Sequence, residues 1–331
     1  MPWFSTLASL PRACVNARGL HVRSTLMLKK IIGNRYAVPV FDARIQWLGV
    51  RRINLGGKAL TNVLKELVSY RSMNVMDEGY LMEQVKERLC YVAASPDADM
   101  AIAQKSRQSN TVAREFVLPD GVTVLRGYVR GEYDDPKREQ RAAAAAAMEA
   151  ASAAPQPAPT RRPGQAGHED EDDAAAASPM DVVTAGEQVL TLNLERFMVP
   201  EALFHPSAIG SPQAGLAETA LAAVSACGAD IRGLLWSNVI VVGGGANCPG
   251  LVDRLIAELR PLVPDNFELN VSAPPKPECA AWRGASVLAS DANFFATHAL
   301  HKQQHHAAGG SAHSEYVHHG TTAKPPPGRM W

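Results

Sequence analysis

The chain has 331 residues, and its 33 lysines and arginines are balanced by 33 aspartates and glutamates. This balance argues against a nucleic-acid or membrane surface spread over the whole protein, and no apolar run reaches the about 18 residues of a membrane-spanning helix. The five cysteines are far apart and never form a Cys-x-x-Cys pair. They indicate reduced thiols in an intracellular protein.

The first 35 residues are basic and match no folding pattern. Residues 1–41 contain six lysines or arginines and no acidic side chain. A stretch of this kind can be a mitochondrial presequence, and a misplaced gene start produces the same composition. We therefore describe residues 1–35 as an unmatched basic N-terminus.

The first segment with a globular pattern covers residues 36–130. An apolar strand leads to Gly56-Gly57, and the sequence KALTNVLKELVSY then predicts a helix. The apolar face of this helix is Leu60, Val63, Leu64 and Leu67. A second helix is predicted over GYLMEQVKERLCYVA, with the inner stripe Leu81, Val85, Leu89 and Val92. The alternating stretch REFVLPDGVTVLRGYV has a Pro-Asp-Gly turn at residues 119–121, and it predicts a β-hairpin.

Two further stretches lack folding signals. Residues 131–185 are rich in alanine, proline and charge, and so few large apolar side chains cannot offset the entropy of ordering the chain. We expect a disordered insertion there. Residues 297–331 are expected to form a disordered tail, which carries seven of the ten histidines. The glycine, alanine and serine between these histidines fix no coordination geometry, so we expect no metal site.

The second segment with a globular pattern covers residues 186–296. It begins with a predicted strand at residues 188–193 and a predicted helix near residues 216–227. A strand that ends in three glycines follows, then an amphipathic helix, a strand at residues 267–271 and a last helix from about residue 284. Helices that alternate with strands are typical of the α/β class.

The three glycines Gly243, Gly244 and Gly245, which we name the glycine corner, follow an apolar run at residues 239–242. Glycine lets the backbone approach a flat or anionic ligand closely, and it tolerates positive φ. A dinucleotide fingerprint would need one more glycine at the start of the helix, and it is absent here. No Walker pattern with Gly-Lys-Ser/Thr occurs either. The corner alone is therefore typical of a tight strand–helix connection, and a ligand site is the alternative.

Several landmarks occur in a fixed order along both segments. They are VPVF, RRINLGGKALTNVLKEL, VKERLCYVA, VLPDG, ERFMVPEALFHPSAIG, ADIRGLLWSNVIVVGGGANCPGLVDRL and AAWRGASVLAS. In this order they resemble the second half of the actin family. The stretch KALTNVLKELVSYRSMNVMDE and the long insertion between LPDG and ERF are more similar to nuclear actin-related proteins than to conventional actin. The resemblance implies an α/β, actin-like (ribonuclease H-like) fold, mainly its second lobe, with a disordered insertion.

The resemblance starts near residue 36, and nothing before it matches the first lobe of the family. We therefore expect a truncated gene model of a longer protein, or a form of marginal stability. In either case the sheet of the second lobe would lack its opening strands and present an unpaired edge.

The resemblance also implies an adenosine pocket between two subdomains. The glycine corner would line one wall, with Ala246 and Cys248 at its edge, and Gly57 would approach from a strand–helix turn. Lys86 and Glu87 match the family's pair of base- and ribose-contacting residues. An adjacent lysine and glutamate can offer a donor and an acceptor to ribose hydroxyls. A solvated helix face is the alternative interpretation of this pair.

Departures from the family limit what the pocket can do. Glu278 stands where a basic residue near the base is common. The second phosphate hairpin would end at Gly33, but the Lys-Lys-Ile-Ile of residues 29–32 replaces its acidic and small residues, and the first hairpin is absent. ATP hydrolysis needs a positioned metal ion and water. We therefore expect no enzyme activity, no metal site and at most weak binding of ATP or ADP.

By the same resemblance, we expect a scaffold subunit of a nuclear chromatin-remodelling complex that exchanges a variant histone into nucleosomes. Its partners would be a large remodelling ATPase and a small zinc-bearing subunit, with nucleosomes or histones as indirect partners. The acidic run at residues 169–173 could touch histone tails, although a solvated charge run is the simpler interpretation. We expect no membrane binding and no filament formation. The alternatives are a cytoskeletal actin-like ATP-binding protein in the cytoplasm and a mitochondrial nucleotide-binding protein.

Overall fold

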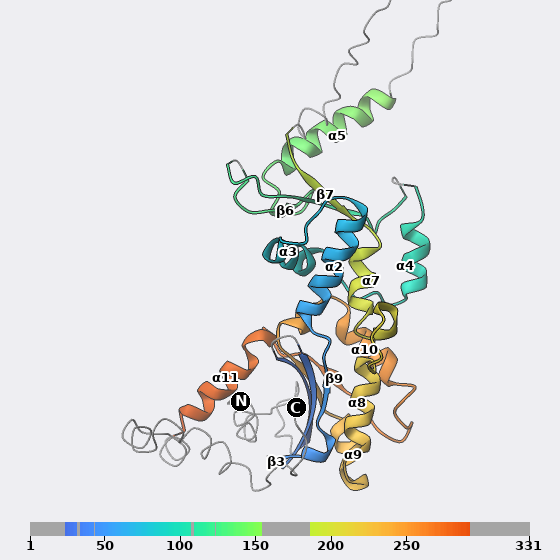
Figure 1. Cartoon of the computed structure of the whole chain (residues 1–331), viewed down its shortest axis with the longest axis vertical. Helices are drawn as coiled ribbons and strands as arrows, with labels where there is room; N and C mark the ends of the chain where they lie inside the picture. The colour runs from blue at the N-terminus through green and yellow to red at the C-terminus, as the bar shows by residue number, and fades with distance from the viewer. Residues whose placement is uncertain are drawn as a thin grey trace, which may run out of the picture. The chain divides into compact units, whose positions relative to one another are not determined.

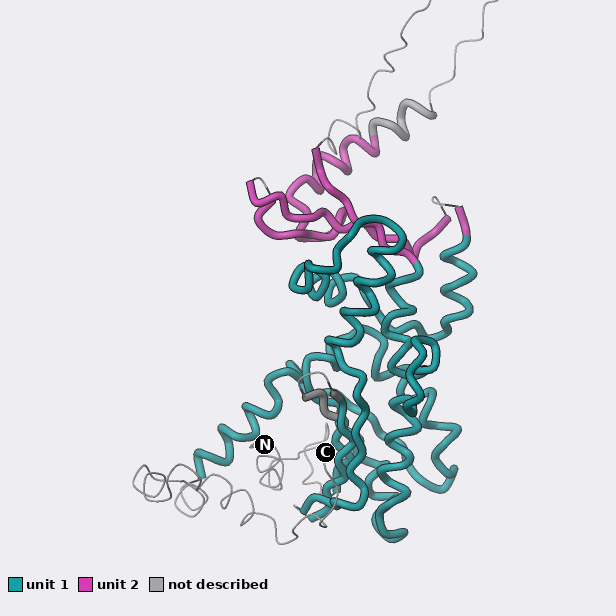
Figure 2. The backbone as a smooth tube through the Cα atoms, in the orientation of Figure 1, with its two compact units in different colours: residues 1–104, 194–331 teal, residues 105–193 magenta. Residues whose placement is uncertain are grey.

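The computed structural model of the chain describes residues 24–31, 34–42, 44–106, 109–122, 124–153 and 186–291. The chain divides into two compact units (Figure 2): unit 1 is formed from residues 1–104 and 194–331, and unit 2 from residues 105–193. Both globular segments of the sequence therefore contribute to unit 1. The His-rich tail at residues 297–331 lies outside the described residues.

Unit 1 combines a mixed sheet with several helices (Figure 1). Its strands are β1 (Ser24–Ile31), β2 (Asn34–Phe41), β3 (Arg44–Ile45), β4 (Arg51–Ile53), β8 (Val239–Val242) and β9 (Val271–Ser272). Its α-helices are α2 (Gly57–Arg71), α3 (Gly79–Leu89), α4 (Pro96–Ala103), α7 (Glu195–Glu201), α8 (Leu216–Ser225), α9 (Ala229–Trp236), α10 (Leu251–Leu259) and α11 (Ala280–Ala289). Its short 3-10 helices are η1 (Trp47–Gly49), η2 (Pro206–Ile209), η3 (Gly244–Asn247) and η4 (Pro277–Cys279).

The sheet of unit 1 has the strand order β3-β2-β1-β8-β9, and β4 pairs with β2 as well. β1 and β2 form an antiparallel hairpin in which Ile31 lies opposite Asn34. β1 runs parallel to β8, and β8 runs parallel to β9. The sequence of β8 is VIVV, and such a β-branched run suits a strand that is covered on both faces.

Strand β1 lies in a region that the sequence pattern assigns to the unmatched basic N-terminus. Residues 24–31 instead form a strand between β2 and β8, and Leu26 and Leu28 are buried. Both edges of β1 are hydrogen-bonded to a neighbouring strand, so an opening strand that we expect from the sequence alone to be missing is present in the sheet. The composition does not predict this strand, because its apolar stretch is short and has basic residues on either side.

Helices α8 and α9 pack against β1, β2 and β4 on one side of the sheet (Figure 1). Helix α10 packs against α8 and β9. Its Leu251 and Leu255 are fully buried because they lie one helical turn apart on the same face. Burial of a leucine side chain contributes roughly 1.5–3 kcal/mol relative to exposure. Trp236, at the end of α9, is the largest fully buried side chain in this core.

The two predicted helices of the first segment are confirmed as α2 and α3, but their buried faces differ in detail. Leu67 is 40% exposed, and Val68 is buried in its place. In α3, Met82 is fully buried while Leu81 is only half-buried, and the helix ends at Leu89. Neighbouring positions differ by about 100° around a helix axis. A broad apolar pattern does not decide between such neighbours.

The last strand and the last helix also differ from the prediction. β9 covers only Val271–Ser272, and Phe267 lies instead in a turn, where its N–H donates to the carbonyl of Pro264. Helix α11 begins at Ala280 instead of near residue 284, and none of its residues is buried.

Unit 2 contains the strands β5 (Arg114–Val117), β6 (Tyr128–Val129) and β7 (Val189–Leu192) and the helix α5 (Arg138–Ala153). The strand order is β6-β5-β7, and both pairs are antiparallel. The predicted hairpin is thus confirmed by β5 and β6. In its connection, Oδ1 of Asp120 accepts hydrogen bonds from the N–H groups of Val122 (2.9 Å) and Val124 (2.7 Å). Gly121 has a φ of 75°, the left-handed conformation that glycine tolerates.

Helix α5 lies in the insertion that we expect to be disordered from residue 131. The structure differs from that expectation over residues 138–153, where the sequence is REQRAAAAAAMEAASA. Alanine has the highest intrinsic helix propensity, so this run forms a helix without large apolar side chains. Residues 154–185, including the acidic run, lie outside the described residues.

Candidate functional site

The glycine corner joins the end of β8 to the short helix η3. Gly243 has φ 95° and ψ 160°, a conformation that a residue with a Cβ atom adopts only under strain. Its N–H donates to the carbonyl of Pro277 (2.9 Å), which ties the corner to η4. A Cβ atom at Gly244 would meet no atom within 4 Å. The corner therefore presents bare backbone to open space on one side.

The residues after the corner contact the chain that follows α3. The N–H of Val92 donates to the carbonyl of Pro249 (2.8 Å), and a Cβ atom at Gly250 would lie 2.3 Å from the carbonyl oxygen of Val92. The thiol of Cys248 lies 4.0 Å from the carbonyl oxygen of Cys90. These contacts bring the corner to the C-terminal end of α3, which carries the predicted lysine–glutamate pair.

Lys86 and Gly57, two predicted site residues, are in direct contact. The Nζ atom of Lys86 donates to the carbonyl of Gly57 (3.1 Å) and to Oγ1 of Thr61 (2.7 Å), and this side chain is only 10% exposed. Glu87 is exposed, and the structure records no hydrogen bond or ion pair of its side chain with any described residue. Lys86 is therefore part of a junction between α2 and α3, while Glu87 faces solvent.

Glu278 is held against the glycine corner. The side-chain amide of Asn247 donates to its carboxylate (2.9 Å). This hydrogen bond lowers the pKa of the Glu278 carboxyl. A negative charge beside the corner disfavours a polyanionic group at the same place.

The β1–β2 hairpin carries basic residues where the family resemblance implies a phosphate hairpin. Lys29 and Lys30 pair with Tyr36 and Arg35 across the two strands. Gly33, the predicted end of the hairpin, lies outside the described residues. Neither strand contains an aspartate or a glutamate. The two strands therefore offer no carboxylate oxygen, the ligand type that Mg²⁺ prefers.

One charged residue at this site is missed by the sequence interpretation. Arg35 of β2 is buried, with 7% of its surface exposed, and it lines a small cavity beside the corner. Other residues around this cavity are Leu28, Leu216, Val241, Gly245 and Ala246. The Nε atom of Arg35 has no hydrogen-bond partner among the described residues, and burial lowers the pKa of the guanidinium to about 10. A lone arginine at the start of the apolar stretch RYAVPVF is the sequence signal that could have found it.

The four cysteines among the described residues are free. Burial raises the pKa of the Cys90 thiol to about 12. Burial also raises the pKa of Cys248, although the charge of Arg35 acts in the opposite direction. Both thiols are therefore protonated at neutral pH, so Cys248 at the edge of the corner is a neutral group and a poor nucleophile. Cys14 lies outside the described residues.

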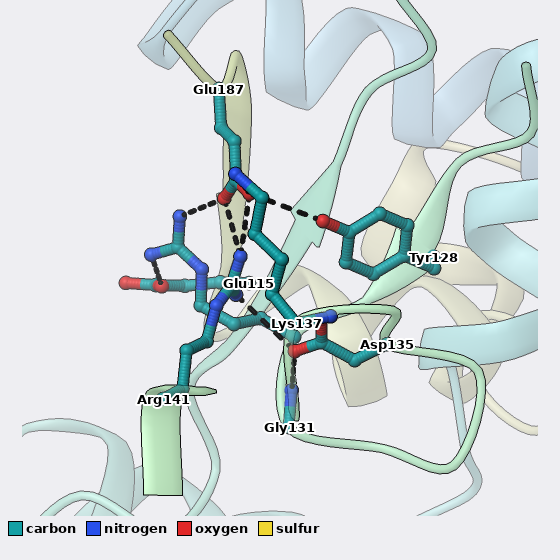
Figure 3. Close-up of polar contacts among 8 residues, drawn as sticks. Glu115, Tyr128, Gly131, Asp135, Lys137, Arg141 and Glu187 are labelled. Atoms are coloured by element: carbon teal, nitrogen blue, oxygen red, sulfur yellow. Dashed lines mark hydrogen bonds and ion pairs between the residues drawn. The ribbon is translucent and has the colours of Figure 1, made fainter. Parts of the chain in front are cut away.

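A second polar cluster lies in unit 2 around Glu187 (Figure 3). Its carboxylate lies 2.6 Å from Nη2 of Arg141, 3.0 Å from Nζ of Lys137 and 3.0 Å from Nη2 of Arg130. The hydroxyl of Tyr128 donates to the same carboxylate (3.2 Å). Burial by itself raises the pKa of the Glu187 carboxyl, but hydrogen bonds from Lys137 and Arg130 and the charge of Arg141 lower it overall.

Two more carboxylates complete this cluster. Glu115 pairs with Arg130, and Asp135 lies 3.3 Å from Nη1 of Arg141. The cations and the carboxylates of the cluster are thus equal in number, and they come from α5, β5, the residue after β6, the segment before β7 and the loop before α5. Because its charges balance internally, the cluster stabilises the attachment of α5 to the sheet of unit 2. We assign it a structural role.

The described residues contain no group of three or more His, Cys, Asp or Glu side chains placed to hold a metal ion. Since the His-rich tail lies outside these residues, the absence of a metal site stays a prediction. Among the helices that the structure describes, none is long and apolar enough to cross a membrane.

Comparison with known proteins identifies the class to which this sheet and its glycine corner belong. The family model of actin matches residues 32–320. The chain therefore belongs to the actin family, and its α/β architecture is consistent with the predicted actin-like fold.

Within this family, several curated relatives are named actin-related protein 6. The chain is 39% identical over 263 residues to that of Oryza sativa subsp. japonica, which covers 78% of this chain and 56% of the relative. The relative from Arabidopsis thaliana is 38% identical over 260 residues, covering 78% of this chain and 55% of the relative. That of Drosophila melanogaster is 36% identical over 259 residues, covering 78% and 54%. The chain spans about half the length of these relatives, and it is an actin-related protein of the actin-related protein 6 class.

Proposed function

We propose that the chain is a non-catalytic scaffold subunit of a nuclear chromatin-remodelling complex that exchanges a variant histone into nucleosomes. The observation that carries the proposal is the similarity to actin-related protein 6 over 78% of the chain. The partners that we propose are a remodelling ATPase and a small zinc-bearing subunit, with nucleosomes or histones as indirect partners. We propose no filament formation and no membrane binding.

The chemistry of the corner supports a scaffold more than an ATPase. Open space at Gly244 suits the flat face of a base, and the exposed Glu87 could accept a ribose hydroxyl. Lys86 already donates to two protein acceptors. The hairpin strands contain no carboxylate for Mg²⁺, and Glu278 adds a negative charge beside the corner. We therefore propose weak binding of ATP or ADP through the nucleoside, without hydrolysis.

Affinity capture of the tagged full chain from nuclear extract, followed by mass spectrometry, tests the proposed assembly. We expect a remodelling ATPase and a small zinc-bearing subunit in the captured set, with tagged conventional actin as the control. Recovery of actin-filament proteins without remodeller subunits would favour the cytoskeletal alternative. A fluorescent fusion should accumulate in the nucleus, and a mitochondrial signal would contradict the proposal.

Equilibrium dialysis with labelled ATP and ADP, together with a phosphate-release assay, tests the nucleotide part. We expect weak binding and no phosphate release above the buffer blank. Glu278→Lys should raise the affinity severalfold, because it replaces a negative charge beside the corner with a positive one. Glu268→Lys makes the same charge change at an exposed position outside the corner and should leave the affinity unchanged. Rapid hydrolysis by the unmodified chain would overturn the scaffold assignment.

A further inference from the structure

The cavity beside the glycine corner contains a buried positive charge for which the described residues supply no counter-charge. Arg35 is 7% exposed, and its Nε atom has no hydrogen-bond partner in the part of the chain that the structure describes. Among the described residues, the structure records no ion pair with its guanidinium. A buried charge without a partner is strongly unfavourable, because the protein does not replace the hydration that the charge loses.

The strands near Arg35 do not neutralise it. None of β1, β2, β3 and β4 contains an aspartate or a glutamate, so these strands supply no carboxylate. The residue that pairs with it on β1 is Lys30, a further cation. A thiolate at Cys248 would interact favourably with Arg35, but burial raises the pKa of that thiol and keeps it neutral at pH 7. The guanidinium, with a pKa of about 10, stays charged.

The size and lining of the cavity restrict what can fill it. Its volume is about 10 Å³, about the room that one water-sized atom or ion requires. Apolar side chains of Leu28, Leu216 and Val241 form part of the wall, and Gly245 and Ala246 of the corner segment form another part. The non-hydrogen atoms of a phosphate group do not all fit in this volume of about 10 Å³. A cation is excluded by the charge of the arginine.

We propose that this cavity binds one small monovalent anion, chloride under ordinary solution conditions, against the Arg35 guanidinium and beside the glycine corner. The anion neutralises the buried charge and fills the space that the apolar walls leave. A bound water could accept a hydrogen bond from Nε, but it would leave the charge uncompensated. The proposed site does not depend on the scaffold function, and its wall shares Gly245 and Ala246 with the predicted nucleotide pocket.

Thermal unfolding of the full chain tests this site, with sodium gluconate replaced stepwise by sodium chloride at constant ionic strength. Gluconate is too large for the cavity. The Tm should rise with chloride by several degrees and then saturate, as for a ligand that binds only the folded state. Arg35→Met should abolish this dependence and should melt above the unmodified chain in gluconate. Arg52→Met, which removes an exposed arginine of β4, is the matched control and should keep the chloride response.

The chloride NMR line width supplies a measurement that does not require Arg35→Met to fold. The unmodified chain and Arg52→Met should broaden the chloride line, and bromide should compete with this broadening. The proposal is overturned if the unmodified chain shows no chloride-specific change in Tm or line width. It is also overturned if Arg35→Met folds and keeps the response. A larger rise of Tm with phosphate than with chloride would contradict the size argument.

Discussion

At the scale of single residues, Gly250 is a position where backbone conformation and a neighbouring segment both require glycine. Its φ is 78°, and a Cβ atom there would lie 2.3 Å from the carbonyl oxygen of Val92. We expect Gly250→Ala to lower the free energy of unfolding by about 2–3 kcal/mol, because left-handed strain and a backbone clash act together. Urea denaturation measures the loss. Gly244→Ala, where the added atom meets nothing within 4 Å, should cost less than about 0.5 kcal/mol. Equal losses at the two positions would contradict this steric explanation.

Arg254 is a buried cation that, in contrast to Arg35, has its counter-charges. Its Nη2 atom lies 3.0 Å from Glu201 and 2.7 Å from Glu258, and its Nη1 atom donates to the carbonyl of Ala93 (3.0 Å). We expect Arg254→Met to lower the free energy of unfolding by about 2–4 kcal/mol, because the half-buried carboxylates of Glu201 and Glu258 lose their partner. The double variant Arg254→Met/Glu201→Met should recover much of this loss in the same urea measurement. A single variant that costs less than about 1 kcal/mol would show that the pair is well solvated.

At the scale of elements, helix α5 depends on Glu187 for its attachment. Glu187→Gln removes the charge shared by Arg130, Lys137 and Arg141, so amide hydrogen exchange over residues 138–146 should become faster. The pKa of Glu187 is lowered in the folded state. Its contribution is therefore complete above the unfolded-state pKa of about 4.3, and it is lost as the pH falls through the lower folded-state pKa.

The pH dependence supplies a second measurement of this attachment. Protection of residues 138–146 should decrease below about pH 4 in the unmodified chain, because protonation of Glu187 removes the same charge. Glu139→Gln changes an exposed carboxylate on the same helix and is the matched control. Unchanged exchange in Glu187→Gln would show that the ion pairs contribute little to the position of α5.

At the scale of the whole molecule, the two units differ in what holds them together. Unit 1 has a six-stranded sheet with helices packed on it, whereas the strands of unit 2 have only four, two and four residues. We expect unit 2 to open at a lower urea concentration than unit 1. Hydrogen exchange at increasing urea should release residues 114–117 before residues 251–259. Simultaneous release of both segments would show a single cooperative unit.

Some elements follow from local sequence alone. The apolar period of KALTNVLKELVSY predicts α2, and the turn PDG predicts the β5–β6 hairpin, because both signals lie within the segment that folds. Helix α5 is missed, since the low complexity of its sequence outweighs the helix propensity of alanine in such an interpretation. Strand β1 is missed because it is defined by distant partners. The side-chain amide of Asn238 donates to Oγ1 of Thr25 (2.7 Å), far along the chain.

The candidate site divides in the same way. The sequence contains the glycine corner and the Lys86–Glu87 pair, and the resemblance to the actin family implies that both contribute to one adenosine pocket. The structure brings Lys86 to Gly57, leaves Glu87 in solvent and holds Glu278 against Asn247. The role of these residues in nucleotide binding stays a prediction. None of these three arrangements can be predicted from the sequence, because each depends on how separate elements pack together.

By itself, the sequence determined the family of this protein, its α/β class, the glycine corner and the lack of carboxylates in the first 41 residues. Only the tertiary structure decided that Arg35 is buried without an ion-pair partner among the described residues, whereas Arg254 is buried between two carboxylates. The physical reason is that residue types and periods are local properties of the chain. The free energy of a charge depends on its exposure to solvent and on the counter-charges around it. Both are set by segments that are distant in the sequence.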